Sequence, residues 1–456
     1  MFTTQPSPTS IPVSAIATED FGKWRVGLDS RTTEWIDAQG FRASAGSVCL
    51  LPGADGAPSR ALVGMPRGQW LWALAPLVKA LPGRDCYLET DLDSQSAHQA
   101  ALGFALATYR YTRYGKTAHP HGALALPTGV SESAVQQDFA AISLARDLIN
   151  TPPQDLMPEH LQGATEDVAA AFDASVSTIV GDALIDEGYP AIHAVGRASA
   201  HAPRLIDLRW GDPAHPLVTL VGKGVCFDSG GLDIKPANGM RLMKKDMGGA
   251  AHALGLAQRV MAAQLPVRLR LLIPAVENAI SGSAFHPGDV LATRAGKTVE
   301  VDNTDAEGRL ILCDALTEAS REKPEQIIDF ATLTGAARVA LGTEVPAMFS
   351  NNNVMANELA EAGEHVCDPL WRLPLHQPYR TLLESQIADM VNSASTPFGG
   401  AITAALFLES FIENDVPWTH FDLMAWNNKS RPGRPEGGEA MALRACFAQI
   451  QARFAT

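Results

Sequence analysis

The sequence is poor in cysteine and lacks the features that mark secreted and membrane-spanning proteins. Its 456 residues include six cysteines, scattered along the chain without a CxxC pair. In a chain of this length they predict reduced, mostly buried thiols. No uninterrupted apolar run approaches the roughly 18 to 20 residues needed to span a bilayer. The first residues show no basic stretch followed by an apolar one, so we expect no signal peptide, no membrane contact and a cytoplasmic location.

Excess positive charge is also lacking. The chain has 36 Lys and Arg against 50 Asp and Glu, a formal net charge of -14. Because phosphate contacts need clustered Lys and Arg, this balance argues against nucleic acid or an anionic membrane as the main partner, although a local basic patch is still compatible with it. The 46% hydrophobic and 19% charged content is ordinary for a globular protein, and the length allows two or three domains.

The order of the segments predicts two domains. Residues 1–125 contain short apolar runs and one helical stretch, which we interpret as a smaller N-terminal α/β domain. The segment KTAHPHGALALPTGVSE is rich in Pro, Gly and His and marks the boundary, so residues 126–456 form the second, larger predicted domain. His119 and His121 in this segment are either part of an exposed linker or a metal-binding pair, and the flanking prolines and glycine favour the linker.

From residue 204 onward, buried strands alternate with helices. This alternation predicts an α/β fold whose sheet is mixed but mostly parallel and is flanked by helices. Polar motifs at strand ends of such sheets tend to be functional. The predicted strands are 204–210, 217–225, 267–276, 326–335 and 418–426, and the predicted helices are 247–264, 309–323 and 400–412.

Two carboxylates stand two residues apart in VEVDNTDAEGRLIL, residues 299–312. Asp305 and Glu307 are followed by Arg309 where a strand runs out and an apolar helix is expected. One interpretation is a solvated loop with a helix N-cap. The other is half of a metal site.

A second polar segment occurs in VGKGVCFDSGGLDIKPANGMRLMKKDMGGAA. Lys223 and Asp228 lie at a strand end, Lys235 follows, and Asp246 precedes a Gly-Gly helix start. Taken alone, these residues are explained by a Lys–Asp salt bridge and an N-cap at Asp246. Together with the acids of the other segment they make four carboxylates at one edge of a parallel sheet. Such a cluster repels itself unless cations are shared, which is the chemistry of a two-metal site.

At these residues the sequence resembles the leucyl aminopeptidase family, the cytosolic dinuclear metallo-exopeptidases. The two segments match the two family motifs in order and spacing, supported by DFATLTGA (329–336) and ARDLINTPP (145–153). The resemblance covers about residues 130–456, and the N-terminal part is only compatible with the family's smaller domain.

The resemblance implies a ligand set for two divalent ions in each subunit. Asp228 and Glu307 would bridge the ions, Lys223 and Asp246 would complete the shell of one ion, and Asp305 that of the other. Zn²⁺ or Mn²⁺ suits these ligands, and Mg²⁺ or Co²⁺ would be substitutes. We expect an extended backbone here, because alternate residues then point the same way and both Asp305 and Glu307 face the metals.

Catalytic and substrate-binding roles are also implied by the resemblance. Lys235 would stabilise the gem-diolate as charge develops on the carbonyl oxygen, and Arg309 would hold a bicarbonate that acts as general base. Thr332, Leu333 and Gly335 would line the substrate cleft. Met243 would form an apolar wall of the first side-chain pocket, with ordinary core packing as the alternative.

The implied enzyme is an aminopeptidase that hydrolyses the N-terminal bond of peptides or dipeptides with a metal-bridging water or hydroxide. Its partners would be peptides with a free N-terminus and further copies of itself in a homohexamer. A nucleic-acid-binding accessory protein and a catalytically silent scaffold on the same fold are the alternatives. Two departures from the family pattern are His286, where arginine is often found, and residues 424–441.

Overall fold

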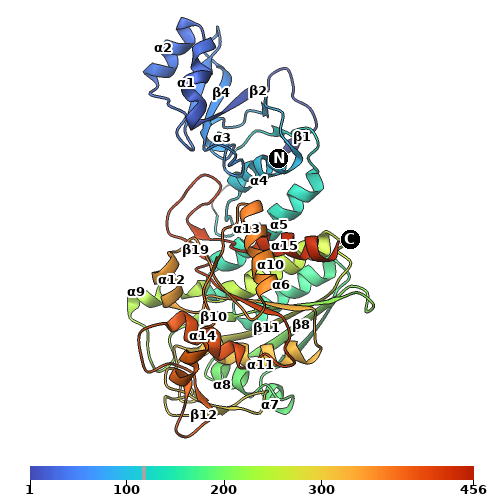
Figure 1. Cartoon of the computed structure of the whole chain (residues 1–456), viewed down its shortest axis with the longest axis vertical. Coiled ribbons are helices and arrows are strands. Elements are labelled where there is room, and N and C mark those ends of the chain that lie inside the picture. Colours follow the sequence, from blue (N-terminus) through green and yellow to red (C-terminus); the bar gives the residue numbers. More distant parts are fainter. Residues whose placement is uncertain (116–119, 456) are drawn as a thin grey trace. The chain divides into compact units, whose positions relative to one another are not determined.

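The computed structural model describes residues 1–115 and 120–455, which form two compact units (Figure 1). The first unit contains residues 1–143 and the short segment 428–436. The second contains residues 144–427 and the C-terminal residues from 437 onward. The boundary predicted between residues 125 and 126 lies ahead of helix α5 (Glu132–Asn150) and stays a prediction. In the described part of the chain, no helix is long and apolar enough to cross a membrane.

The first unit is built on a six-stranded sheet in the order β1-β6-β5-β2-β4-β3. Only β3 runs antiparallel to its neighbour, and the other pairs are parallel. Its strands are β1 (Phe2–Thr3), β2 (Ile11–Ala17), β3 (Val48–Pro52), β4 (Pro58–Met65), β5 (Cys86–Leu88) and β6 (Leu124–Ala125). Its helices are α1 (Phe21–Trp24), α2 (Ser30–Ala38), α3 (Leu77–Ala80) and α4 (Ser94–Thr108), with the 3-10 turns η1 (Thr18–Asp20) and η2 (Arg25–Gly27).

The second unit is built on a nine-stranded mixed sheet. Eight strands follow the order β16-β15-β18-β14-β9-β11-β8-β7, and β10 pairs with β11. The central pairs are parallel, whereas β8 and β15 are antiparallel to β11 and β18. The strands are β7 (Ser175–Val180), β8 (Arg204–Trp210), β9 (Leu217–Gly222), β10 (Gly224–Asp228), β11 (Arg268–Asn278), β14 (Gln326–Ala331), β15 (Ala347–Ser350), β16 (Trp371–Arg372) and β18 (Trp418–Asp422).

Two small sheets complete this unit. They contain β12 (Val290–Ala292), β13 (Thr298–Glu300) and β17 (Met390–Val391) in one, and β19 (Trp426–Asn427) and β20 (Gly437–Gly438) in the other.

Helices cover both faces of the large sheet. Figure 1 shows α6, α10 and α15 on one face and α8, α11 and α14 on the other. The helices are α6 (Pro158–Ala171), α7 (Ala183–Asp186), α8 (Pro190–Gly196), α9 (Ala237–Met240), α10 (Gly248–Ala262), α11 (Glu307–Arg321), α12 (Gly335–Leu341), α13 (Asn353–His365), α14 (Gly400–Glu409) and α15 (Leu443–Phe454). The 3-10 turns are η3 (Pro153–Asp155), η4 (Met243–Lys245) and η5 (Gln377–Leu383).

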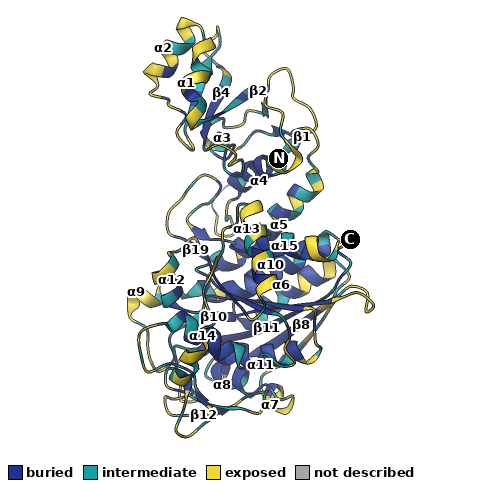
Figure 2. Cartoon of the chain, in the orientation of Figure 1, coloured by how far each residue is buried: buried dark blue, intermediate teal, exposed yellow. Residues whose placement is uncertain are grey.

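The central strands are buried on both faces, as Figure 2 shows for the interior of this unit. Every residue of LVTLVG in β9 and of QIIDFA in β14 is buried. Continuous apolar runs of this kind are typical of parallel strands that lie between two layers of helices. The predicted α/β fold, with a mostly parallel mixed sheet, flanking helices and a smaller N-terminal domain, is confirmed.

Two glycines allow α10 to lie directly against the sheet. A Cβ on Gly249 would be 2.0 Å from the carbonyl oxygen of Phe330, and one on Gly222 would be 2.5 Å from the Cα of Ala250. Neither distance is tolerated, so both positions require glycine. The close approach fixes the start of α10, and with it Asp246, beside the ends of β9 and β14.

Candidate active site

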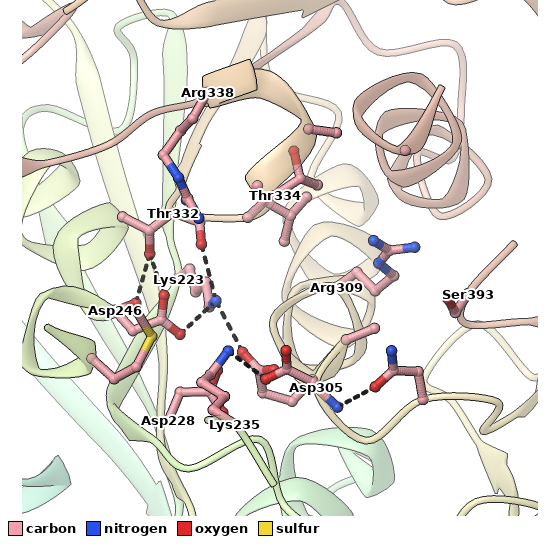
Figure 3. Close-up of a pocket in the computed structure, with 18 of the residues that line it drawn as sticks. Lys223, Asp228, Lys235, Asp246, Asp305, Arg309, Thr332, Thr334, Arg338 and Ser393 are labelled. Atoms are coloured by element: carbon pink, nitrogen blue, oxygen red, sulfur yellow. Dashed lines mark hydrogen bonds and ion pairs between the residues drawn. The ribbon is translucent and has the colours of Figure 1, made fainter. Parts of the chain in front are cut away.

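Three of the predicted acids converge at the carboxyl edge of the large sheet (Figure 3). Asp228 is the last residue of β10, Asp305 lies in the turn after β13, and Glu307 is the first residue of α11. One carboxylate oxygen from each lies within 4.8 Å of the other two. Asp228 and Glu307 are almost fully buried, whereas the Asp305 side chain is 33% exposed.

The backbone around Asp305 differs from the expected extended segment. Residues 302–306 form a turn, and α11 starts at Glu307, so the expectation that strand alternation aligns the two acids is wrong. The Asn303 side chain accepts a 2.8 Å hydrogen bond from the Asp305 N–H. Side chains of this type stabilise turns in competition with strands. The acids therefore meet because a turn is followed by the first turn of a helix.

Lys223 joins the fourth acid to this cluster. Its Nζ lies 2.7 Å from Asp246 Oδ2 and 2.9 Å from Glu307 Oε1. Gly308 makes room for it, because a Cβ there would lie 2.5 Å from the lysine Cε. The salt bridge considered in the sequence analysis is thus present, but the N-cap is not. The N-cap position of α10 is Met247, and the Asp246 carboxylate instead accepts a 2.8 Å hydrogen bond from the Thr332 hydroxyl.

The two predicted catalytic cations also reach this site. Lys235 Nζ lies 2.9 Å from Asp228 Oδ2 and forms an ion pair with Asp305. Arg309 is 8% exposed, and its Nη1 donates a 2.6 Å hydrogen bond to the carbonyl oxygen of Asn392. Arg309 Nε has no hydrogen-bond acceptor among the described residues. The guanidinium therefore has donor capacity for an anion.

Burial and mutual repulsion shift the pKa values of the clustered carboxyl groups. Burial, followed by the charge of Asp246, raises the pKa of Asp228. Burial and the charge of Asp228 raise the pKa of Glu307. Burial alone would raise the pKa of Asp246, but the charges of Lys223, Lys245 and Lys235 together outweigh burial and lower the pKa of that carboxyl. Buried carboxylates that raise one another's pKa in this way are stabilised as anions only by nearby positive charge.

The donor set fits divalent metal ions. Asp246 Oδ2, Asp305 Oδ1 and Glu307 Oε1 are buried, and none accepts a hydrogen bond among the described residues, since their contacts with the lysines are ion pairs without hydrogen-bond geometry. Buried carboxylate oxygens without hydrogen-bond donors are suited to coordinate cations. Oxygen ligands with one amine are compatible with several divalent metals.

The predicted substrate residues line the same pocket as the acids. Met243, Thr332, Leu333 and Gly335 all contribute to it. Met243 is half-buried, so it lies at the pocket wall and not in the core. The loop that follows β14 is held by Asp422, whose Oδ1 accepts hydrogen bonds from the Leu333 N–H at 3.0 Å and the Thr334 N–H at 3.1 Å.

Several residues of the site were not predicted from the sequence. Asp422 ends β18, and an acid at the end of a parallel strand was a signal that sequence reasoning could have used. Asn278 donates to Asp228 Oδ1 at 2.9 Å, and no local pattern predicts this contact. Lys245 and Arg338 line the pocket as well. Burial, opposed by the charge of Asp246 and reinforced by nearby Arg338, lowers the pKa of Lys245 to about 8.

The structure describes two of the three histidines singled out in the sequence. His119 lies outside the described residues, and the Nδ1 of His121 is 3.0 Å from the carbonyl oxygen of Gly122. The side chain of His286 is 60% exposed, and its Nδ1 is 3.8 Å from Asp289.

Comparison with protein families accounts for both units. Residues 143–447 match the family model described as the cytosol aminopeptidase family, catalytic domain. The chain belongs to this family. Residues 11–127 match the N-terminal domain of M17 aminopeptidases. The predicted membership in the leucyl (cytosol) aminopeptidase family is confirmed, and the family is one of metal-dependent aminopeptidases that act on peptides.

Known members resemble the chain over different lengths. A probable cytosol aminopeptidase of Roseiflexus castenholzii is 44% identical over 66% of this chain. The matched part corresponds to 63% of the length of that relative. The crystal structure of a cytosol aminopeptidase from Coxiella burnetii is 50% identical, covers 99% of both chains and gives a TM-score of 0.95. The bottromycin maturation enzyme BotP in complex with Mn is 33% identical over 98% of this chain and 99% of its own, with a TM-score of 0.87. No comparison favours the nucleic-acid-binding alternative.

Proposed function

We propose that this member of the cytosol aminopeptidase family removes N-terminal residues from peptides or dipeptides with a site for two divalent metal ions. The observation that carries the proposal is the convergence of Asp228, Asp305 and Glu307 within 4.8 Å, with Lys223 and Asp246 at its border. In this proposal Asp228 and Glu307 would hold the ions together with Lys223, Asp246 and Asp305. Lys223 would have to be neutral to serve as a ligand.

When bound, two divalent ions activate a water and polarise the scissile carbonyl. Zn²⁺ and Mn²⁺ are the candidates, with Mg²⁺ and Co²⁺ as substitutes. The Mn-bound neighbour supports manganese. The acids of the cluster supply the negative charge that such ions require, and a free substrate amine would be bound on the same side of the pocket.

Two cations of the chain would assist the reaction. Lys235 extends into the pocket beside Asp228 and Asp305, where its ammonium can donate to the carbonyl oxygen as negative charge develops. Arg309, with an Nε that lacks an acceptor among the described residues, would hold bicarbonate as the general base. The loop of Thr332, Leu333 and Gly335 would bind the peptide backbone, and Met243 would contact the first side chain.

Assembly and location belong to the same proposal. We infer a cytoplasmic homohexamer, because the family resemblance implies this assembly and the named relatives are cytosol aminopeptidases. Light scattering tests the assembly directly. A mass near the 48.5 kDa of one chain at micromolar concentration would exclude it.

The activity is tested with the full-length protein and leucine p-nitroanilide. We expect hydrolysis after incubation with Mn²⁺ or Zn²⁺, loss of hydrolysis with a chelator, and recovery when metal is returned. N-acetyl-leucine p-nitroanilide is the matched control, because it lacks the free amine and should be resistant. Equal cleavage of both substrates, or activity indifferent to the chelator, would rule out the proposed mechanism.

A further inference from the structure

Two cations line the candidate active site without a protein partner in the described part of the chain. Lys245 ends η4, and it is 2% exposed. Arg338 extends from α12 toward Thr332 (Figure 3). Both contribute to the same pocket as Met243 and the acids. Among the described residues, neither the Lys245 Nζ nor the Arg338 guanidinium forms a hydrogen bond or an ion pair.

The acids near Lys245 are already bound to other groups. Asp246 pairs with Lys223 and accepts the Thr332 hydroxyl. Asp422 accepts two backbone N–H groups and a hydroxyl from the loop after β14. Burying an ammonium group without an anion destabilises a protein strongly. A ligand that enters the pocket with a negative charge would supply the missing partner.

The two cations line one pocket and are close enough for the charge of Arg338 to act on Lys245. Lys245 is two residues from Met243 on the same 3-10 turn, beside the proposed wall of the first side-chain pocket. Arg338 comes from α12, which directly follows the substrate-binding loop. An arginine fork matches the two oxygens of a carboxylate, and a lysine adds a third donor. Met243 and Leu333, which line the same pocket, are apolar and suit the carbon chain that carries such a group.

We propose that Lys245 and Arg338 bind a carboxylate of the substrate and make the enzyme prefer substrates that carry this carboxylate. The carboxylate comes either from the side chain of an N-terminal Asp or Glu, or from the C-terminus of a dipeptide. The inference rests on the proposed aminopeptidase function and adds the substrate class to it.

The test compares substrate pairs on the full-length, Mn-loaded protein. Glutamate and leucine p-nitroanilides differ in the side-chain carboxylate, and Leu-Gly and Leu-Gly-amide differ in the C-terminal one. We expect one carboxylate-bearing member to be preferred by wild type in kcat/KM. In Lys245→Met and in Arg338→Gln this preference should fall about 10-fold to 100-fold, as expected for loss of a hydrogen bond to a charged group. The pair that responds identifies the source of the carboxylate.

Lys244→Met is the matched control. The Lys244 Nζ donates to the carbonyl oxygen of Asn150 at 2.6 Å, and the residue does not line the pocket. Its substrate preference should equal that of wild type. Calorimetric binding of glutamate and leucine to wild type and to the two pocket variants gives a readout independent of turnover. If the side-chain carboxylate is the one that is bound, glutamate should lose more affinity than leucine.

The outcomes separate this inference from the proposed function. An equal loss of kcat/KM on all four substrates in the two pocket variants would show that the cations have a structural role, and the inference would be wrong. A wild type without preference in either pair would also overturn it. Failure of the wild type to cleave any of the substrates would refute the proposed function. The calorimetric comparison of wild type and pocket variants would still show whether Lys245 and Arg338 bind a carboxylate. Arg338 is only partly buried, so its variant keeps the test open if Lys245→Met does not fold.

Discussion

The backbone N–H of Leu333 donates a 3.0 Å hydrogen bond to Asp422 Oδ1, which connects the end of β18 to the loop of the substrate pocket. The same carboxylate accepts the N–H and the hydroxyl of Thr334. On its other side the loop is held by Lys223, whose Nζ donates to the Thr332 carbonyl oxygen at 3.3 Å. The loop is therefore fixed both by Lys223 of the acid cluster and by Asp422 at the end of β18.

Asp422→Asn should loosen this loop. An amide has one acceptor oxygen in place of two, so either the N–H groups or the hydroxyl would lose its acceptor, at a cost of about 1–3 kcal/mol. We expect KM to rise, while metal content stays at the wild-type level because Asp422 is not a proposed ligand. Steady-state kinetics with metal analysis checks this. A loss of metal at unchanged KM would contradict a role in positioning the loop.

Glu307→Gln should be the most damaging isosteric change between residues 299 and 312. It removes charge from the carboxylate proposed to contact both ions, so at least one ion should be lost, and activity with it. Metal stoichiometry after gel filtration is the measurement, with circular dichroism as the folding control. Glu361→Gln, on the exposed face of α13, should keep both ions and full activity. Two ions with wild-type turnover in Glu307→Gln would show that the charge of Glu307 is not needed to hold the ions.

Lys235→Ala should lower kcat by roughly 10²–10³-fold, the loss seen when one oxyanion donor is removed. Metal content should stay nearly intact, because the proposed partner of the ammonium is the carbonyl oxygen of the substrate. The contacts of Lys235 with Asp228 and Asp305 make this a stringent test. Metal loss in the variant would mean that the lysine holds the acids in place.

Arg309→Ala should slow hydrolysis without removing the ions, and added bicarbonate should no longer accelerate it. The measurement is the rate in carbonate-free buffer with and without bicarbonate. Arg321→Ala, at the exposed end of the same helix, is the control and should respond to bicarbonate as wild type does. A wild type that is indifferent to bicarbonate would require a different general base.

Glu318→Gln should destabilise the fold in a pH-dependent way. Burial alone would raise the pKa of Glu318, but its ion pairs with Arg270, 2.8 Å away, and Arg294 lower it overall. A carboxyl whose pKa is lowered by folding stabilises the protein above its unfolded value near 4.5, and this contribution disappears as the pH falls through the folded value. We expect a loss of about 1–3 kcal/mol at pH 7.

Denaturant unfolding at pH 7 and at pH 4 measures this effect, and the difference from wild type should shrink at the lower pH. Glu413→Gln is the control, because its contact with Arg321 is 3.8 Å long and exposed. A constant difference between the two pH values would show that the Glu318 charge is not responsible.

The sequence by itself identified the acids that converge at the candidate site, Asp228, Asp305 and Glu307, but not Asp422 or Asn278 beside them. Acids at the carboxyl ends of parallel strands come to one edge of the sheet, so the strand pattern predicted that these acids meet, although it did not predict the turn that brings Asp305 and Glu307 together. The alternation of buried strands and helices could also be predicted, because hydrophobic periodicity is local and does not depend on distant partners.

The tertiary structure alone decided how these residues are held. The turn at residues 302–306 is closed by the amide of Asn392, which accepts from the Asp302 N–H and donates to the carbonyl oxygen of Asn303. That partner is about 90 residues away in the sequence, so the local pattern wrongly favoured an extended backbone. Whether a buried lysine has a partner likewise depends on residues from other elements. Lys223 meets Asp246 and Glu307, whereas Lys245 meets no acid among the described residues, because sheet order and helix placement set the distances between charges.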